Sequence, residues 1–453
     1  MFSAKFPAIL VAGILIAAGC GGTNAASVGS PSYGGDVLNN AQREQVVDNA
    51  TKALNQGAAP KFTAGLNGFG FDLFRKVAAA TPKANACVSP VSVSSVLAML
   101  YNGSAGETQK QIGETLKAAK LTPEQVNDAA KNLNAVLTNV DPDKVSLDLS
   151  NSLWVSAGTT LSPDFVAKNE TNLGAKVSTL DFQSADAPKT INDWVKEKTK
   201  GKIADIVDKV PADARLYVIN TVYFKGKWAQ AFKKENTHDG DFTLLDGTKE
   251  SVPMMSQTES FGYFTNPDAV GLAMPYGSGR LEMIVLLPAG KNDLAALEKK
   301  LDGGTWMGWM KGMKKQRVEV SMPKFRSDFE TSLNSALKSI GMADAFDPAK
   351  ANFTEIQAKN ALPTKPDRLY LSEVKHKTSV DVNEEGTEAA AATSGQVTAT
   401  AVMLATKFTA DHPFLYAIRD TQTGAVLFLG AMLDPKASGA DQPATKAEAK
   451  PKA

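Results

Sequence analysis

The segment RLYVINTVYFKGKW constrains the fold most, because it carries apolar side chains on both faces of an extended chain. Leu216 and Val218 alternate with Tyr217 and Ile219, which is typical of a central strand covered on both faces of its sheet. The chain has 453 residues, of which 43% are hydrophobic, so it is long and apolar enough to bury a large core around such a sheet. Asn220 lies inside this strand.

Helical patterns precede this strand. Apolar residues from Leu66 to Val77 recur at three- and four-residue steps, which favours an amphipathic helix. In SPVSVSSVLAMLYNGS, Ser89 is placed as an N-cap and Pro90 as the first helical residue. The segment INDWVKEKTKGKI repeats this style and ends near Gly201.

Strand patterns dominate the later half of the chain. GLAMPYGSGRLEMIVLLP predicts two strands around a turn, VEVSMPKFRSDF predicts one strand, and GAVLFLG predicts a short buried strand. Helices that come mostly first and strands that come mostly later predict an α+β fold. No linker divides residues 61–435, so we expect one domain, followed at 436–453 by a tail without large apolar residues.

Charge and motif content exclude several functions. The formal net charge of +1 gives no reason to expect nucleic acid as a partner. The three histidines lack metal-type spacing, and no P-loop or dinucleotide-binding glycine pattern occurs, so we expect no metal and no cofactor. Asp411 and His412 are adjacent, and on a strand their side chains would point to opposite faces; with no GxSxG motif present, we expect no enzyme.

The N-terminus, MFSAKFPAILVAGILIAAGCGG, is typical of an export signal, which we assign to residues 1–19. Its apolar run is too short to span a bilayer. The cysteine that follows, Cys20, resembles the lipidated residue of bacterial lipoproteins, although Ala17 stands where Leu is usual; plain secretion is the alternative. Residues 20–60 predict a flexible tether, within which the polar stretch 41–54 allows a short helix.

Only two cysteines occur, Cys20 and Cys87. If Cys20 is lipidated or removed, Cys87 has no partner, so we expect no disulfide framework in this exported protein. Cys87 lies among apolar residues and is expected to be a buried, inert thiol.

The segment EEGTEAAAATSGQVTATAVML contains a local conflict between helix and strand preferences. Thr387, Glu388 and the run Ala389–Ala392 favour a helix, yet strand-like patterns lie on both sides. Such conflicts often mark a functional segment. Glu384 and Glu385, which precede it, are expected to form a solvated loop base rather than an acid–base pair.

These motifs, taken in order and spacing, resemble the serpin family from about Phe62 to Pro435. The segments that carry the resemblance are NACVSPVSVSSVLAMLYNGSAGET, INDWVKEKTKGKI, VINTVYFKGKW, LPAG, MPKF, LKSIGMADAF, VKHKTSVDVNEEGTEAAAAT, FTADHPFLYAIRD and LFLG. The resemblance implies one α+β domain with three β-sheets, the largest of five strands, eight to nine helices and an exposed reactive-centre loop.

The resemblance also implies a mechanism. A serine protease attacks the loop and forms an acyl-enzyme, and the cut loop then enters the large sheet as a new central strand, dragging the protease with it. The implied partner is therefore a serine protease in a covalent complex with a monomeric inhibitor. The alternative is a non-inhibitory serpin that acts as a protease substrate or a binding scaffold. An envelope substrate-binding lipoprotein would share the signal and tether but would not explain the loop.

By this resemblance the loop hinge consists of Gly386, Thr387, Glu388, Ala389, Ala390, Ala391 and Ala392. In an extended chain Thr387, Ala389 and Ala391 share one face, which would turn into the core on insertion. Small side chains suit that face because protein interiors have little spare volume.

Family spacing from the hinge places the scissile bond at Thr400–Ala401, and counting back from the later FTADHPF motif places it at Ala399–Thr400. No Lys or Arg occurs between Gly386 and Ala405, so we expect an elastase-like or subtilisin-like target rather than a trypsin-like one. The apolar residues VML that follow leave a chymotrypsin-like target open.

The resemblance assigns roles to five further residues. Ser89, Ser92, Asn220 and His376 match the polar cluster, the shutter, that controls opening of the large sheet. Trp228 matches the tryptophan of the breach, where insertion begins. The simpler interpretations are satisfied polar groups in a core and plain aromatic packing.

Overall fold

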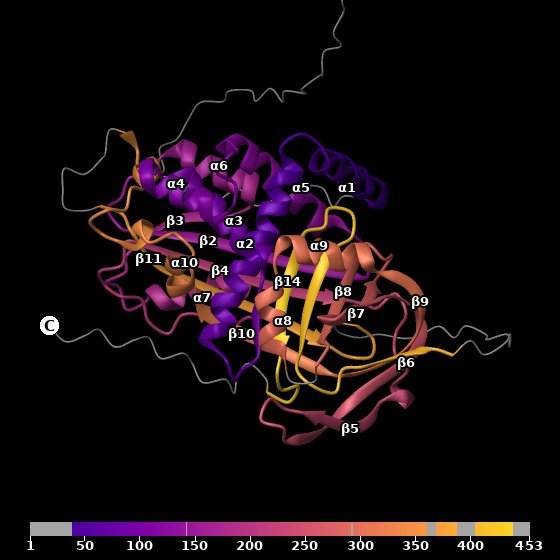
Figure 1. Cartoon of the computed structure of the whole chain (residues 1–453). Helices are drawn as coiled ribbons and strands as arrows, with labels where there is room; N and C mark the ends of the chain where they lie inside the picture. The colour runs from indigo at the N-terminus through magenta and orange to yellow at the C-terminus, as the bar shows by residue number, and fades with distance from the viewer. Residues whose placement is uncertain (1–38, 142, 291–292, 360–367, 387–403, 438–453) are drawn as a thin grey trace, which may run out of the picture. The chain divides into compact units, whose positions relative to one another are not determined.

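The computed structural model describes residues 39–141, 143–290, 293–359, 368–386 and 404–437 (Figure 1). This part of the chain has an α+β architecture, as predicted. Its ten α-helices are α1 (Asn40–Leu54), α2 (Ala59–Ala80), α3 (Pro90–Gly103), α4 (Gly106–Thr115), α5 (Pro123–Asn139), α6 (Pro163–Leu173), α7 (Ala187–Lys198), α8 (Leu294–Lys300), α9 (Gly303–Gly312) and α10 (Asn334–Ser339).

One sheet has five strands in the order β10-β11-β4-β2-β3. β11 and β4 pair in parallel, as do β2 and β3, whereas β10 with β11 and β2 with β4 are antiparallel. The five-stranded sheet expected from the resemblance is therefore present, with β4 at its centre. Its strands are β2 (Val145–Ser156), β3 (Lys176–Leu180), β4 (Leu216–Gly226), β10 (Phe325–Ser332) and β11 (Leu371–Val382).

The remaining strands form a nine-stranded hydrogen-bonded set, in the order β1-β14-β13-β8-β7-β6-β9-β12 with β5 beside β6. The long β6 pairs first with β5, then with β9 and finally with β7, so it joins the two smaller sheets that the resemblance implies. The strands are β1 (Ala86–Val88), β5 (His238–Thr243), β6 (Lys249–Thr265), β7 (Ala269–Tyr276), β8 (Leu281–Pro288), β9 (Lys314–Pro323), β12 (Thr406–Thr409), β13 (Phe414–Asp420) and β14 (Val426–Met432).

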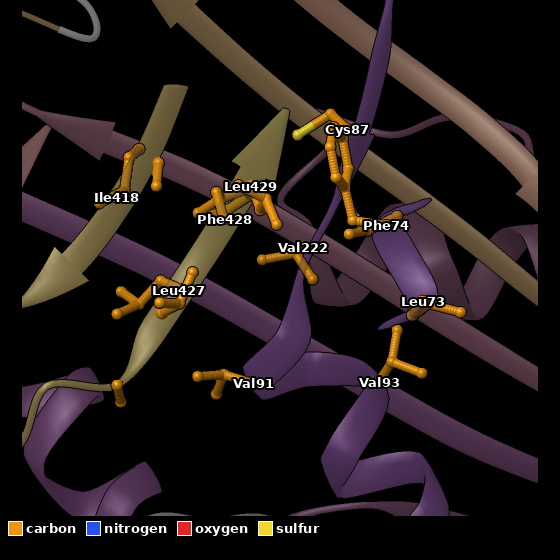
Figure 2. Packing of buried hydrophobic residues seen from close by; sticks show 14 of the residues in the cluster. Leu73, Phe74, Cys87, Val91, Val93, Val222, Ile418, Leu427, Phe428 and Leu429 are labelled. Carbon is orange, nitrogen blue, oxygen red and sulfur yellow. The ribbon is translucent and has the colours of Figure 1, made fainter. Parts of the chain in front are cut away.

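The two faces of β4 enter different cores, as its double apolar pattern predicts. Leu216, Val218 and Val222 join the main core, where Figure 2 shows Val222 among side chains that include Val91 of α3 and Phe428 of β14. The alternate residues Tyr217 and Ile219 join a second core that includes residues of α7. Because alternate side chains of a strand point to opposite faces, helical layers cover both sides of this sheet.

Local sequence signals located several elements correctly. Ser89 caps α3 by accepting a hydrogen bond from the Ser92 N–H at 3.3 Å, and Pro90 is the first helical residue, as predicted. The predicted strand pair around Gly-Ser-Gly is the β7–β8 hairpin. The predicted short buried strand is β14.

The prediction of one strand in VEVSMPKFRSDF is wrong. The segment forms β9 and β10, which are separated by Lys324 and belong to different sheets. The Lys324 N–H still bonds to the Pro253 carbonyl of β6 at 3.0 Å, and from Phe325 onward the chain pairs with β11 instead.

The short helix that the sequence allows at 41–54 is present as α1, and it belongs to the compact unit that begins at Asn40. The buried side chains of α1 are Val47, Ala50 and Leu54, whose spacing places them on one face of the helix. α1 packs on α5, and its Thr51 hydroxyl accepts a hydrogen bond from Arg280 at 2.8 Å. This extra helix accounts for ten helices in the described residues where eight to nine were expected.

Candidate functional site

β11 ends in a tight turn at the start of the predicted hinge. The Asn383 N–H donates to the Gly386 carbonyl at 2.8 Å, and the Gly386 N–H donates back at 3.2 Å. Gly386 has a φ of +129°, and a Cβ there would lie 2.1 Å from the carbonyl oxygen of Gly226, the last residue of β4. Only glycine fits this position, which holds the start of the loop against the end of β4.

The two acidic residues of this turn form ion pairs. Glu384 is 5% exposed, lies 3.0 Å from the Lys324 Nζ and accepts a hydrogen bond from the Thr237 hydroxyl at 2.9 Å. Burial by itself raises the pKa of Glu384, but hydrogen bonds from the backbone, Lys324 and Thr237 outweigh it, so the net pKa is lowered. Glu385 pairs with Lys234 at 2.9 Å. The prediction of a solvated loop base is therefore wrong for Glu384, since tertiary contacts supply its counter-charge.

Trp228 fastens the same turn from the β4 side. Its indole Nε1 donates to the Asn383 carbonyl at 2.9 Å, and its backbone N–H donates to the Glu385 carbonyl at 3.1 Å. The indole stacks on Tyr276 with ring centroids 4.3 Å apart and planes 9° apart. The residue that the resemblance assigns to the breach thus contacts the base of the loop directly.

The four residues assigned to the shutter lie together in one buried hydrogen-bonded network. His376 of β11 and Asn220 of β4 face each other in the parallel ladder, with the His376 Nδ1 2.5 Å from the Asn220 Oδ1. The Asn220 amide donates to the Ser92 hydroxyl at 2.5 Å, and the Ser89 N–H donates to the His376 Nε2 at 3.1 Å. The network therefore ties α3 to the two strands at the centre of the sheet.

The network determines the tautomer of His376, and burial determines its charge. Its Nε2 accepts the Ser89 N–H, so the proton of the neutral ring resides on Nδ1, which donates to Asn220. Burial lowers the pKa of His376 to about 3, so the ring is neutral at physiological pH. A neutral imidazole is required here, because Nε2 has to remain an acceptor.

Sequence reasoning missed one member of the network, Asn151 of β2. Asn151 lies opposite Asn220 in the antiparallel β2–β4 ladder, and its Oδ1 accepts the second hydrogen bond of the Asn220 amide. The polar row therefore crosses three adjacent strands. Its sequence signal was a lone Asn in the strand pattern LDLSNSLWV, which by itself does not distinguish a buried partner from a solvated side chain.

The other end of the predicted loop adjoins a different sheet. Leu404 is 95% exposed, and the following strand β12 pairs in parallel with β9. The hinge residues after Gly386, which are Thr387, Glu388, Ala389, Ala390, Ala391 and Ala392, lie outside the described residues, as do Ala399, Thr400, Ala401 and Cys20. The two anchors of the loop are thus described, while its predicted scissile bond stays a prediction.

Cys87 is fully buried, as predicted, and burial raises the pKa of its thiol to about 11. The prediction that Asp411 and His412 point to opposite faces is wrong, because they lie between β12 and β13 rather than on a strand. The His412 Nδ1 and the Asp411 Oδ1 are 2.7 Å apart. The His412 Nε2 is buried and has no hydrogen-bond partner among the described residues.

Within the described ranges, no group of three or more His, Cys, Asp and Glu side chains is arranged to hold a metal ion. In the same ranges no helix has the length and hydropathy needed to cross a membrane.

Comparison with known proteins identifies the class to which this fold and this loop base belong. The family model described as "Serpin (serine protease inhibitor)" matches residues 64–435. The leukocyte elastase inhibitor of Xenopus tropicalis is 37% identical over 377 residues, which cover 81% of this chain and 97% of that protein. The chain belongs to the serpin family, and this membership supports protease inhibition as its general activity.

Solved structures agree with this assignment. The native state of the thermophilic serpin tengpin matches with a TM-score of 0.76 and 30% identity, covering 84% of this chain and 95% of tengpin. Human thyroxine-binding globulin in complex with thyroxine matches with a TM-score of 0.75 and 27% identity, covering 83% of this chain and 98% of the globulin. The serpin fold is therefore confirmed.

Proposed function

We propose that this chain inhibits serine proteases as a suicide substrate, by forming an acyl-enzyme at its loop and inserting the cut loop between β4 and β11. The observation that carries the proposal is the position of Gly386, which bridges to Lys227 directly after β4 and lies four residues after the end of β11. β4 and β11 run parallel, so a chain that turns back at Gly386 would run antiparallel to both.

Insertion is favoured because one parallel hydrogen-bond ladder would be exchanged for two antiparallel ones. The present β4–β11 ladder extends from Leu216 opposite Leu371 to Phe224 opposite Val380, and insertion would replace it with two antiparallel ladders. About ten additional hydrogen bonds at roughly 0.5 to 1.5 kcal/mol each correspond to on the order of 10 kcal/mol. The lost conformational freedom of the loop offsets part of this gain.

The polar row supports the same proposal. Asn220 and His376 bond to each other across the β4–β11 border, so this border cannot open until their hydrogen bond breaks. On insertion between β4 and β11, the side chains of Thr387, Ala389 and Ala391 would face the core. We propose Thr400–Ala401 as the scissile bond, with Ala399–Thr400 as the alternative register, and an elastase-like, subtilisin-like or chymotrypsin-like protease as the target.

The test is a reaction with four proteases, namely pancreatic elastase, subtilisin, chymotrypsin and trypsin, analysed on denaturing gels. We expect a denaturant-resistant covalent complex with elastase or subtilisin and none with trypsin. Elastase whose active-site serine has been blocked is the control, because it cannot form the acyl bond. The mass of the released C-terminal fragment identifies the scissile bond. Cleavage without any complex across the panel would place the chain among the non-inhibitory serpins.

We propose further that the protein is bacterial, that residues 1–19 direct its export and that lipidation of Cys20 anchors it in the cell envelope, with secretion as the alternative location. The support is the sequence alone. Metabolic labelling with a fatty acid tests this in cells producing the full chain and a Cys20→Ala variant. We expect label in the former only; equal absence of label with a released protein would favour plain secretion.

A further inference from the structure

A polar pocket of about 310 Å³ lies at the end of the five-stranded sheet where β4 begins. It is lined by the turn after β2 (156–159), the chain after β3 (181–183), residues within 212–215 and Gln357. The loop base at Gly386 bridges to the residue directly after β4. The pocket is therefore at the opposite end of β4 from the loop, and an 11-residue strand spans about 35 Å.

Gln357 is the residue of this pocket that points to a ligand. It is 8% exposed, its backbone N–H donates to the Thr354 carbonyl at 3.2 Å, and its backbone forms a bridge with Leu161. Its side-chain amide has no hydrogen-bond partner among the described residues. Polar side chains buried to this degree are normally paired, so the donors and the acceptor of this amide are available to a molecule in the pocket.

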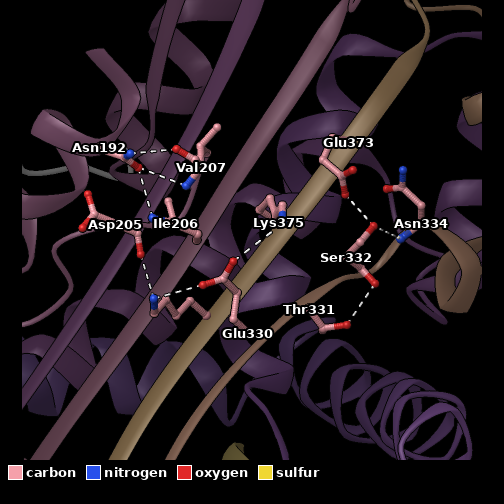
Figure 3. Close-up of polar contacts among 11 residues, drawn as sticks. Asn192, Asp205, Ile206, Val207, Glu330, Thr331, Ser332, Asn334, Glu373 and Lys375 are labelled. Atoms are coloured by element: carbon pink, nitrogen blue, oxygen red, sulfur yellow. Dashed lines mark hydrogen bonds and ion pairs between the residues drawn. The ribbon is translucent and has the colours of Figure 1, made fainter. Parts of the chain in front are cut away.

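The wall that precedes β4 is held in place from two sides. The Arg215 N–H donates to the Ser372 hydroxyl of β11 at 2.8 Å. Earlier in the same segment, the side-chain amide of Asn192 in α7 forms hydrogen bonds with the backbone of Ile206 and Val207 (Figure 3). A ligand would therefore meet a wall that is already ordered, which lowers the entropic cost of binding.

The charge of the lining favours a neutral ligand. Asp181 and Arg215 are its two ionised residues, so their formal charges cancel. The other polar side chains of the lining are amides and hydroxyls, namely Gln183, Gln357, Ser156 and Thr159. An apolar ligand would remove water from these groups without replacing its hydrogen bonds, and a ligand with a net charge would find no net counter-charge. A neutral molecule with several hydroxyl groups satisfies both conditions, because each hydroxyl donates and accepts.

We propose that this pocket binds a neutral sugar, with the Gln357 amide as its central hydrogen-bonding partner. This inference goes beyond protease inhibition and does not depend on it. A volume of about 310 Å³ is at the small end of ligand sites in proteins, which favours about one or two sugar rings over a long chain. The amide offers a donor and an acceptor side by side, which match two adjacent hydroxyls or an acetamido group. Phe182 and Ala214 supply apolar surface for the CH groups of the ring.

A sugar in this pocket would leave the loop accessible to a protease, because the pocket and the loop base are at opposite ends of β4. Binding to a surface that carries such sugars would thus be compatible with the proposed inhibition.

The test measures the binding of four sugars to the purified protein by isothermal titration calorimetry. The four share one ring: glucose and N-acetylglucosamine are neutral, glucosamine is positively charged and glucuronate is negatively charged. We expect saturable binding of at least one neutral sugar, with a dissociation constant on the order of 1 mM. Both charged sugars should bind on the order of tenfold more weakly, because their charge lacks a counter-charge in the pocket.

Substitutions locate the site. Gln357→Leu removes the amide and should weaken binding of the neutral sugar on the order of tenfold. Gln422→Leu is the matched control, since it makes the same change in an exposed side chain outside this pocket, and it should leave binding unchanged. If Gln357→Leu does not fold, Thr159→Val takes its place, because Thr159 is partly exposed and lines the same pocket. The neutral sugar should also slow hydrogen–deuterium exchange of residues 156–159.

Three results would each overturn the proposal. The first is no binding of either neutral sugar at roughly 50 mM, well above the expected dissociation constant. The second is tighter binding of glucosamine or glucuronate, which would contradict the neutral ligand. The third is equal binding by the wild type and the pocket variant, which would show that the sugar binds elsewhere.

Discussion

His376 of β11 and Asn220 of β4 are opposite each other in a parallel ladder, and their side chains share a hydrogen bond at the border where a new strand would enter. The imidazole can play this role only while neutral, since its Nε2 accepts the Ser89 N–H. Protonation would replace that acceptor with a second donor inside a buried site.

Stability should therefore fall in acid through His376. Its pKa is about 3 in the folded protein against an ordinary 6.5, so between these values the unfolded chain binds one proton more. The free energy of unfolding should decrease by up to about 1.4 kcal/mol per pH unit as pH falls from about 6.5 towards 3. Unfolding followed from pH 7.5 to 4.5 should show a shallower slope in His376→Gln than in the wild type. His238→Gln, at an exposed position, is the control, and equal slopes in all three proteins would contradict the prediction.

Replacing Asn151 should destabilise the protein, although this residue belongs to none of the sequence motifs described above. Asn151→Ala leaves one buried hydrogen of the Asn220 amide without its acceptor, which costs about 1 to 3 kcal/mol. Denaturant unfolding measures this cost, with Ser146→Ala on the same strand as the control. In Asn220→Ala, the further substitution of Asn151 should cost much less, and full additivity would argue against the network.

Gly386→Ala should detach the base of the loop. The added Cβ would collide with the Gly226 carbonyl, and the alanine would have an unfavourable φ. The turn therefore has to move away from β4. We expect a lower melting temperature and faster nicking of the loop by a non-target protease. Gly424→Ala separates the two causes, because Gly424 also has a positive φ but no atom within 4 Å of an added Cβ. Equal effects of both substitutions would point to backbone strain alone.

The Glu384–Lys324 pair should contribute more to stability than the Glu385–Lys234 pair. Glu384 is almost fully buried and bonds to both Lys324 and Thr237, whereas Lys234 is largely exposed. A double-mutant cycle of Glu384→Gln and Lys324→Met should give a coupling of about 1 to 3 kcal/mol. The matching cycle on Glu385 and Lys234 should give a smaller coupling, because solvent screens the exposed Lys234 ammonium. A coupling at Glu384 no larger than that at Glu385 would refute the ranking.

Thr387→Arg should convert an inhibitor into a substrate. Thr387 lies outside the described residues, so this prediction rests on the alternation of an extended hinge, which turns Thr387 towards the core and Glu388 away from it. A buried arginine would slow insertion and give the protease time to complete hydrolysis. The ratio of complex to cleaved chain should fall in Thr387→Arg and stay near the wild type in Glu388→Arg. Undiminished complex formation by Thr387→Arg would show that the hinge is placed wrongly.

The sequence alone was sufficient to predict structure and family where the signal is local or where a family pattern spans many residues. The Ser89 cap depends on a residue three positions away, and the two apolar faces of β4 are visible in its own alternation. The order of motifs from Phe62 to Pro435 predicted the family, and the family model at residues 64–435 confirms it.

The tertiary structure decided which side chains form hydrogen bonds with partners that are distant in the sequence. Asn151 and Asn220 are 69 residues apart, and neither pattern indicates that the other supplies its hydrogen bond. Likewise, Lys377 meets the Asp205 carbonyl across 172 residues of chain. The sequence determined most of the helices and strands, because those preferences act over a few residues. Only the packed fold decided which buried polar groups would be paired, because the cost of leaving one unpaired arises only once water has been excluded.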